Sequence, residues 1–136
     1  MKRFVSALMM IVCIFCMAAC GGNVKEVQIL EYSSKVYSDK DIQDAIDVTK
    51  DYFKKKFSGC TLTEITYYGD DKLPDYQEFA QRNNADEVIV LVSSFDVGPS
   101  GGDGSLNPND TYRNWKWILV RNDGGEWVHV DHGYKR

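Results

Sequence analysis

The clearest candidates for chemistry lie in a glycine-rich stretch between residues 98 and 110. Four of its side chains carry oxygen atoms at close spacing, namely Asp103, Ser105, Asn107 and Asp110. Carboxylate and carbonyl oxygens are the ligands that calcium prefers. The loop is also long for a compact domain, and such loops often carry function. We therefore expect residues 98–110 to form a recognition surface, with a calcium site as a weaker hypothesis.

Two departures from known calcium loops weaken that hypothesis. An EF-hand loop needs a glycine at its sharp turn and a bidentate glutamate at its end, and Pro108 and Asn114 stand at those positions. Leu106 replaces the aspartate of a glycine-rich calcium repeat, and no tandem copy follows. The alternative is an ordered loop whose short polar side chains bond to the backbone.

A serine motif occupies the start of the same loop. Residues 98–102 read Gly-Pro-Ser-Gly-Gly and match the G-x-S-x-G pattern of a nucleophilic serine. That pattern requires a helix directly after the serine. Glycines follow Ser100 here and disfavour a helix, so we do not assign Ser100 a catalytic role.

Three titratable residues lie close together near the end of the chain. Strict strand alternation places His129 and Asp131 on one face and His132 on the other. Two histidines on opposite faces cannot share a metal ion, so surface or edge positions are the favoured interpretation. The alternative is an acid–base role for Asp131 or His129, which for Asp131 requires an apolar pocket that raises its pKa.

The tryptophans are the remaining candidates for ligand contact. Trp115 and Trp117 share a face of one expected strand, and Trp127 follows the next turn. Aromatic residues mainly build cores, and a stacking platform for a sugar or peptide is the alternative. The full set of candidate ligand contacts is Asp96, Asp103, Asn107, Asp110, Trp115, Trp117 and Trp127.

The first residues have the composition of an export signal. Lys2 and Arg3 precede an apolar stretch, and small residues follow it. The uncharged run 4–19 has 16 residues, which is short of the roughly 20 that span a bilayer. A cleaved signal peptide is therefore favoured over an uncleaved membrane anchor.

Met17-Ala18-Ala19-Cys20 resembles a bacterial lipobox, in which a cysteine becomes the lipidated first residue of the mature protein. The resemblance implies that residues 1–19 are removed and that Cys20 carries a diacylglyceryl group. Two acyl chains meet the requirement for stable anchoring, which one chain does not. An ordinary signal followed by an accidental cysteine is the alternative. We expect a lipid-anchored protein on the cell membrane that faces outside the cytoplasm.

Charge and cysteine content limit the partners. Loss of Lys2 and Arg3 with the signal takes the formal net charge from −4 to −6, which disfavours nucleic acid as a partner. Cys60 is the one cysteine after Cys20, so no internal disulfide is expected. We interpret Cys60 as a small buried residue. No cofactor is expected.

The remaining residues predict a single α+β domain over residues 38–134, after a flexible tether at 20–37. A short strand formed by Val27, Ile29 and Leu30 is the alternative within that tether. Helical spacing predicts one long helix at 39–57, with Ser38 as its N-cap and Asp41 completing a capping box. A short helix is expected at 75–83. Strands are expected at 61–68, 88–97, 115–121 and 126–132, with a tight hairpin turn at 122–125. Together they predict a long helix and a short helix packed on one face of a curved antiparallel sheet of about four strands.

The segment from Trp117 to Tyr134, with a strand, an Asn-Asp-Gly-Gly turn and a strand that begins near Trp127, resembles the last hairpin of NTF2-like or cystatin-like domains. The domain as a whole is similar to small lipoproteins of Gram-positive gut anaerobes. This resemblance implies a fold but no activity, since such folds host both enzymes and binding modules. A non-catalytic binding or interaction domain is the leading hypothesis. The alternatives are a small pocket enzyme of NTF2-like type and a calcium-stabilised surface accessory module.

Thermal unfolding tests the calcium hypothesis. Because a ligand that binds only the folded state raises the unfolding midpoint, a structural ion would make that midpoint depend on calcium. We expect the same midpoint in calcium and in chelator. A midpoint several degrees higher in calcium would show that the 98–110 loop, or another site, holds the ion.

Overall fold

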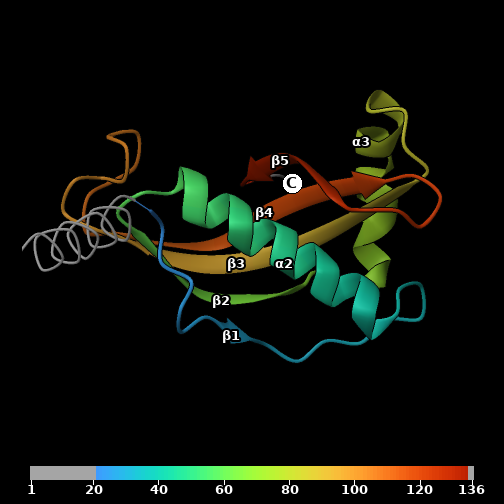
Figure 1. Cartoon of the computed structure of the whole chain (residues 1–136), viewed down its shortest axis with the longest axis horizontal. Helices are drawn as coiled ribbons and strands as arrows, with labels where there is room; N and C mark the ends of the chain where they lie inside the picture. The colour runs from blue at the N-terminus through green and yellow to red at the C-terminus, as the bar shows by residue number, and fades with distance from the viewer. Residues whose placement is uncertain (1–20, 135–136) are drawn as a thin grey trace, which may run out of the picture.

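The computed structural model describes residues 21–134 as an α+β domain with a single five-stranded sheet. The strands follow one another across the sheet in the order β1-β2-β3-β4-β5 (Figure 1). The sheet is mixed, because β1 runs parallel to β2 while the other pairs are antiparallel. We expected about four strands, all antiparallel. The sheet has a fifth, the short edge strand β1, and that strand is parallel to its neighbour. The signal peptide expected at 1–19 and the lipidation expected at Cys20 lie outside the described residues.

The elements have the following bounds. They are β1 (Gln28–Ile29), α2 (Asp39–Lys56), β2 (Cys60–Tyr67), the 3-10 helix η1 (Asp70–Tyr76), α3 (Gln77–Arg82), β3 (Glu87–Val97), β4 (Thr111–Arg121) and β5 (Val128–Gly133). The long helix and the four long strands match the predicted elements. The predicted short helix is split into η1 and α3, with Pro74 inside η1.

Helix α2 is specified at both ends by its sequence. The Ser38 side chain accepts a hydrogen bond from the Asp41 amide, and the Asp41 carboxylate accepts one from the Ser38 amide. This confirms the predicted capping box. The chain leaves the helix through Gly59, whose φ of +74° favours glycine. The buried face of the helix comprises Ile42, Ala45, Ile46, Thr49 and Phe53.

The sheet is covered on both faces, and this corrects the expectation that its helices share one face. Helix α2 crosses one face, where Phe53 contacts Phe95 and Trp117 (Figure 1). Val88 and Val90 of β3 point to the opposite face of the sheet, because side chains alternate along a strand, and both are buried. η1 and α3 pack against β3 and supply the cover for that second face. No helix among residues 21–134 is long and apolar enough to cross a membrane.

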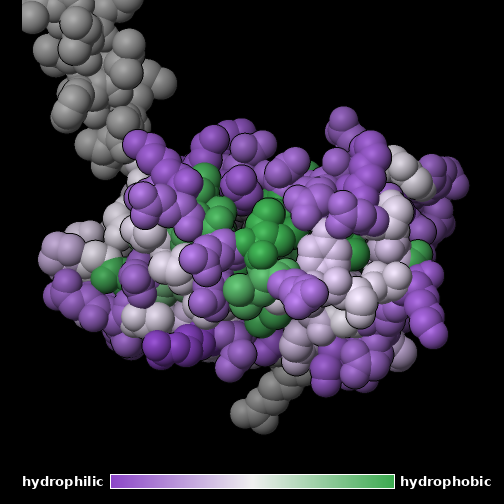
Figure 2. All heavy atoms as spheres, turned by 90° about the horizontal axis from the view of Figure 1, so that it is seen from below, coloured by the Kyte–Doolittle hydropathy of each residue, from purple (hydrophilic) through white to green (hydrophobic). Residues whose placement is uncertain are grey.

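Residues 21–37, which composition predicts to be a flexible tether, lie along the domain. The Gly22 amide donates to the Lys54 carbonyl at 2.9 Å, and the Asn23 amide donates to the Cys60 carbonyl at 2.9 Å. β1 then pairs with β2. Figure 2 shows an apolar area on the side of the molecule where β1 lies, and in this segment Ile29 and Leu30 are exposed. The described domain thus begins at the first residues after Cys20.

A buried arginine joins three elements at the start of α2. Arg121 of β4 is 8% exposed and pairs with Glu87 of β3 and, at 3.0 Å, with Asp41 of α2. Its guanidinium also lies 4.1 Å from the centre of the Trp127 ring. The same Asp41 caps the helix, so Arg121 ties the helix start to the sheet.

We expect Arg121→Ala to destabilise the domain by at least about 2 kcal/mol. The cost lies between that of breaking a fully buried pair, about 3–5 kcal/mol, and that of an exposed pair, about 0–1 kcal/mol, because both carboxylates keep some solvent contact. Urea unfolding of the chain from residue 20 onward, with Cys20→Ser, measures the loss. Arg82→Ala is the matched control, since Arg82 pairs with Glu78 at the surface. Equal losses in the two variants would contradict this role for Arg121.

Candidate functional site

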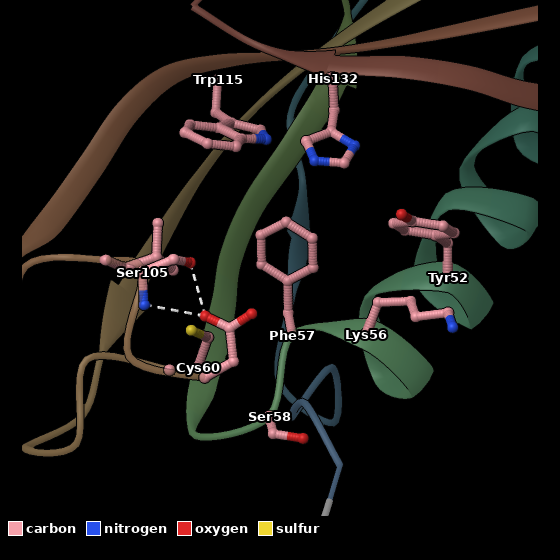
Figure 3. Close-up of a pocket in the computed structure, with 11 residues that line it drawn as sticks. Tyr52, Lys56, Phe57, Ser58, Cys60, Ser105, Trp115 and His132 are labelled. Carbon is pink, nitrogen blue, oxygen red and sulfur yellow. Dashed lines mark hydrogen bonds between the residues drawn. The ribbon is translucent and has the colours of Figure 1, made fainter.

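A cleft opens at the end of the domain where α2 finishes. It has a volume of about 310 Å³ and lies between the last turn of α2, the start of β2, the 98–110 loop and the ends of β4 and β5. Figure 3 shows Phe57 at its centre, with Trp115 and His132 on one side and Ser105 and Cys60 on another. Tyr52 and Lys56 of α2 line the remaining wall.

The two histidines lie together beside this cleft, which corrects the prediction that they occupy opposite faces. Ile118 of β4 pairs with Asp131, while the next residue, Leu119, pairs with His129. Val130 is therefore an extra residue, a β-bulge that shifts the alternation by one position. As a result His129 and His132 share a face, with His129 Nε2 and His132 Nδ1 separated by 3.2 Å.

Aromatic rings surround the histidine pair. The Tyr52 ring lies 4.0 Å from the His129 ring between centroids, and His132 lies beside Phe57, Trp115 and Trp117. Burial in this setting lowers the pKa of His129 to about 4, with a further lowering by His132 and an opposing effect of Asp131. Burial also lowers the pKa of His132. Both rings are neutral near pH 7.

Trp115 contributes an unsatisfied donor to the cleft. Its indole Nε1 is buried and has no hydrogen-bond partner. Figure 3 shows this nitrogen on the side of the ring that faces His132. Because a buried N–H without a partner costs about 1–3 kcal/mol, native structures rarely keep one without a reason. Trp115 is therefore the predicted ligand contact that the structure best supports.

The other two tryptophans belong to the core. Trp117 is fully buried, and its Nε1 donates to Ser93 Oγ at 2.8 Å. Trp127 is 4% exposed, and its Nε1 donates to the Asp41 carbonyl at 3.0 Å. Both were candidate ligand contacts by sequence, but the indole N–H of each is already bonded within the protein. Trp127 lines a second, larger cavity between α2 and the β4–β5 turn.

The loop candidates are divided between the cleft and the surface. Asp103 and Ser105 line the cleft, and Asp103 Oδ1 accepts hydrogen bonds from the Ser105 amide and hydroxyl. These bonds lower the pKa of Asp103. Asn107 bonds instead with Asp110 at 3.4 Å. The four predicted calcium ligands thus form two separate hydrogen-bonded pairs.

Asp96 lies away from the cleft. Its neighbours Phe95 and Val97 are buried on the side of α2, so alternation turns Asp96 to the other face of the sheet, where it accepts a hydrogen bond from Thr111 Oγ1 at 2.7 Å. Within residues 21–134, no group of three or more His, Cys, Asp or Glu side chains is placed to hold a metal ion.

Cys60 lines the base of the cleft. It is 2% exposed, as the sequence predicted for a small buried residue. Burial, followed by the charge of Asp103, raises the pKa of its thiol. The side chain is therefore a neutral thiol near pH 7 and is poorly suited to act as a nucleophile.

Sequence reasoning missed the part that α2 plays in the site. Tyr52 and Phe57 belong to the predicted apolar face of the helix, and nothing in their spacing separates cleft from core. The pairing of the histidines was missed as well, because a bulge at Val130 leaves no clear mark in a run of strand-forming residues.

A larger cavity, of about 630 Å³, lies between the first half of α2 and the β4–β5 turn. Its rim carries Lys40, Asp44, Asp47 and Glu126, and Lys40 is already paired with Asp44 at 2.7 Å. No unsatisfied buried side-chain group of the described residues lies in this cavity, since Trp115 Nε1 is the one such atom. We therefore favour the smaller cleft as the functional site.

Comparisons of the chain with models of known protein families, with curated proteins and with solved structures found no match.

The histidine pair predicts a specific dependence of stability on pH. Each ring binds a proton less tightly in the folded state than in the unfolded chain, whose histidines have a pKa of about 6.5. The stabilisation is therefore complete above pH 6.5 and is lost as the pH falls from 6.5 toward 4. The loss is at most about 1.4 kcal/mol per pH unit for each titrating histidine.

Urea unfolding between pH 7.5 and 4.5 measures this loss, and proton NMR follows the two histidines, which are the only ones in the chain. The carboxylates with lowered pKa, Asp41, Asp70 and Asp103, affect stability mainly below this range. Stability that stays constant from pH 7.5 to 4.5, or histidines that titrate near 6.5 in the folded state, would contradict the buried pair.

Proposed function

We propose that this chain is a membrane-anchored extracytoplasmic lipoprotein whose domain binds a small ligand in the cleft at the end of α2, without catalysis. The observation that carries the binding proposal is the unsatisfied Trp115 Nε1 beside His132 in an aromatic cleft. Ligand sites are typically concave and apolar, with a few polar groups that fix orientation. This cleft has that composition.

The lipid anchor is supported by the sequence around Cys20. The basic start, the short apolar run and Ala18-Ala19-Cys20 fit a signal peptide that is cleaved directly before a lipidated cysteine. The described domain begins directly after this residue, and its Gly22 amide is bonded to Lys54 at the end of α2. The cleft also lies at the end of α2, so a lipid on Cys20 would place the cleft on the side of the domain nearest the membrane.

We also propose a cystatin-like rather than NTF2-like arrangement. A single long helix, α2, precedes and crosses an antiparallel meander of β2 to β5, and this arrangement favours that assignment, with η1 and α3 as an insertion between β2 and β3. The interior of the sheet supports a binding module too. Phe53 and Trp117 fill the space between the middle of α2 and the sheet, and the cleft opens beyond them, where the helix ends.

The candidate catalytic groups have other partners. His129 Nε2 is paired with His132, and Asp131 Oδ1 accepts a hydrogen bond from the His132 amide at 2.8 Å. Neither residue lines the cleft. This placement favours binding over the acid–base role that the sequence left open.

Fractionation of cells that express Cys20→Ser tests the anchor. We expect the variant to leave the membrane fraction or to accumulate with its signal attached, because it has no thiol that can take up lipid. Cys60→Ser is the matched control and should stay with the membrane. A Cys20→Ser chain that lost its signal and yet remained membrane-bound would refute the lipoprotein assignment.

A further inference from the structure

The chain is bonded to the end of α2 from its first described residues. Figure 1 shows this start of the domain beside the end of the helix. The Gly22 amide donates to the Lys54 carbonyl at 2.9 Å, which satisfies one of the carbonyls that the last turn of a helix leaves free. Asn23 donates to the Cys60 carbonyl and accepts from the Leu62 amide, each at 2.9 Å. The segment is therefore fixed to the domain.

Glycine is required at the two positions that follow Cys20. A Cβ atom on Gly21 would lie 2.8 Å from the Lys54 carbonyl oxygen, and one on Gly22 would lie 2.4 Å from the Phe53 carbonyl oxygen. Side-chain carbons do not approach backbone oxygens so closely, so glycine is what lets the chain lie against the helix. Consecutive Cα atoms are about 3.8 Å apart, so a lipid on Cys20 would be attached one residue from this contact.

The last turn of α2 carries a basic surface beside this attachment point. It consists of Lys54, Lys55 and Lys56, which are all exposed. Lys54 lies 3.9 Å from Asp51, whereas Lys55 and Lys56 make no ion pair with any residue of 21–134. Asp103, the acid that lines the cleft together with Lys56, accepts hydrogen bonds within its own loop. The basic surface is thus available to an anionic partner.

The charges of the helix are divided along its length. Its first half carries a single lysine against four acids, namely Asp39, Asp41, Asp44 and Asp47. An anionic lipid surface would attract the basic end of the helix and repel the acidic start. The helix has 18 residues and is about 27 Å long, a distance over which salt screens that repulsion.

We propose that the end of α2 is a membrane-docking surface, on which Lys54, Lys55 and Lys56 contact anionic lipid headgroups beside the lipid of Cys20. The proposal rests on the proposed lipid anchor and adds a fixed orientation to it. A lipid on a flexible tether would leave the domain free to turn. A lipid attached directly at the end of α2 holds the three lysines close to the headgroups.

Lysine acetylation on vesicles tests the docking. The protein is the chain from residue 20 onward with Cys60→Ser, so that a single thiol remains and is coupled to a maleimide-bearing lipid. This coupling makes the attachment independent of processing in cells. The vesicles consist of phosphatidylcholine alone or of an equimolar mixture with phosphatidylglycerol. Mass spectrometry measures the rate at each lysine, and Lys40 at the start of α2 is the internal reference.

On the anionic vesicles we expect acetylation of Lys54, Lys55 and Lys56 to slow at least about fivefold relative to Lys40. The attraction of one lysine near an anionic surface corresponds to about that factor. Most of the protection should disappear on phosphatidylcholine alone, and also on the anionic vesicles in about 1 M salt, where charges are screened within about 3 Å.

Charge reversal assigns the protection to the basic surface. Lys54→Glu combined with Lys55→Glu should remove most of the protection at Lys56. Lys35→Glu combined with Lys72→Glu is the matched control and should keep it. It makes the same change of charge at the other end of the domain, where the Lys35 amide bonds to Asp70 in the first turn of η1.

Amide hydrogen exchange tests the contact that fixes the orientation. The amides of Gly22 and Asn23 donate hydrogen bonds, so both should be protected in the chain from residue 20 onward with Cys20→Ser. Exchange at both amides as fast as in an unfolded chain would show a flexible tether, and the fixed orientation would be refuted.

Two results on the vesicles would overturn the docking surface. One is equal acetylation of Lys40 and of the three lysines on anionic vesicles, and the other is protection at Lys56 that survives the charge reversal. Either result leaves the lipid anchor standing, because fractionation of Cys20→Ser tests the anchor separately. A failure of the anchor in cells leaves the vesicle result unchanged, so the two failures are distinguishable.

Discussion

Helix α2 lies on the sheet through a single apolar face, and both the core and the cleft depend on that contact. Phe53 packs on Phe95 and Trp117 in the interior, and one turn later Phe57 packs on the same residues and on His132. The helix is held in place at its other end by Arg121, which pairs with Asp41 and Glu87. The middle of the helix thus covers the sheet closely, and the cleft opens where the helix ends.

The sequence predicted the elements that local rules determine. The capping box at Ser38, the spacing of apolar residues along α2 and the positive φ angles of Asp123 and Gly124 in the hairpin turn each follow from a few neighbouring residues. The buried run in β3 was also predictable, since continuous apolar residues indicate a strand covered on both faces. The burial of Trp117 could be proposed from composition, but its bond to Ser93 could not.

What the sequence could not predict depends on long-range pairing. The bulge at Val130 is set by the register of β5 on β4, and it moves His132 to the face of His129. A second bulge, where two positions of β3 (Ser93 to Phe95) face three of β4, lets Tyr112 and Trp115 share a face although they are three positions apart. The parallel pairing of the short strand β1 could not be predicted, because its partner β2 lies more than thirty residues along the chain. Strand alternation predicts faces correctly only where the ladder is regular.

The central claim is that Trp115 keeps a free indole N–H at the cleft while the other tryptophans bond theirs within the core. Hydrogen exchange of the three indole protons in the ligand-free chain measures this directly. All three nitrogens are buried, but exchange should be faster at Trp115, which has no hydrogen bond to break, than at Trp117 and Trp127, whose nitrogens donate at 2.8 Å and 3.0 Å. Equal protection of all three indoles would mean that Trp115 has a partner inside the protein, and the cleft would lose the donor on which its proposed function rests.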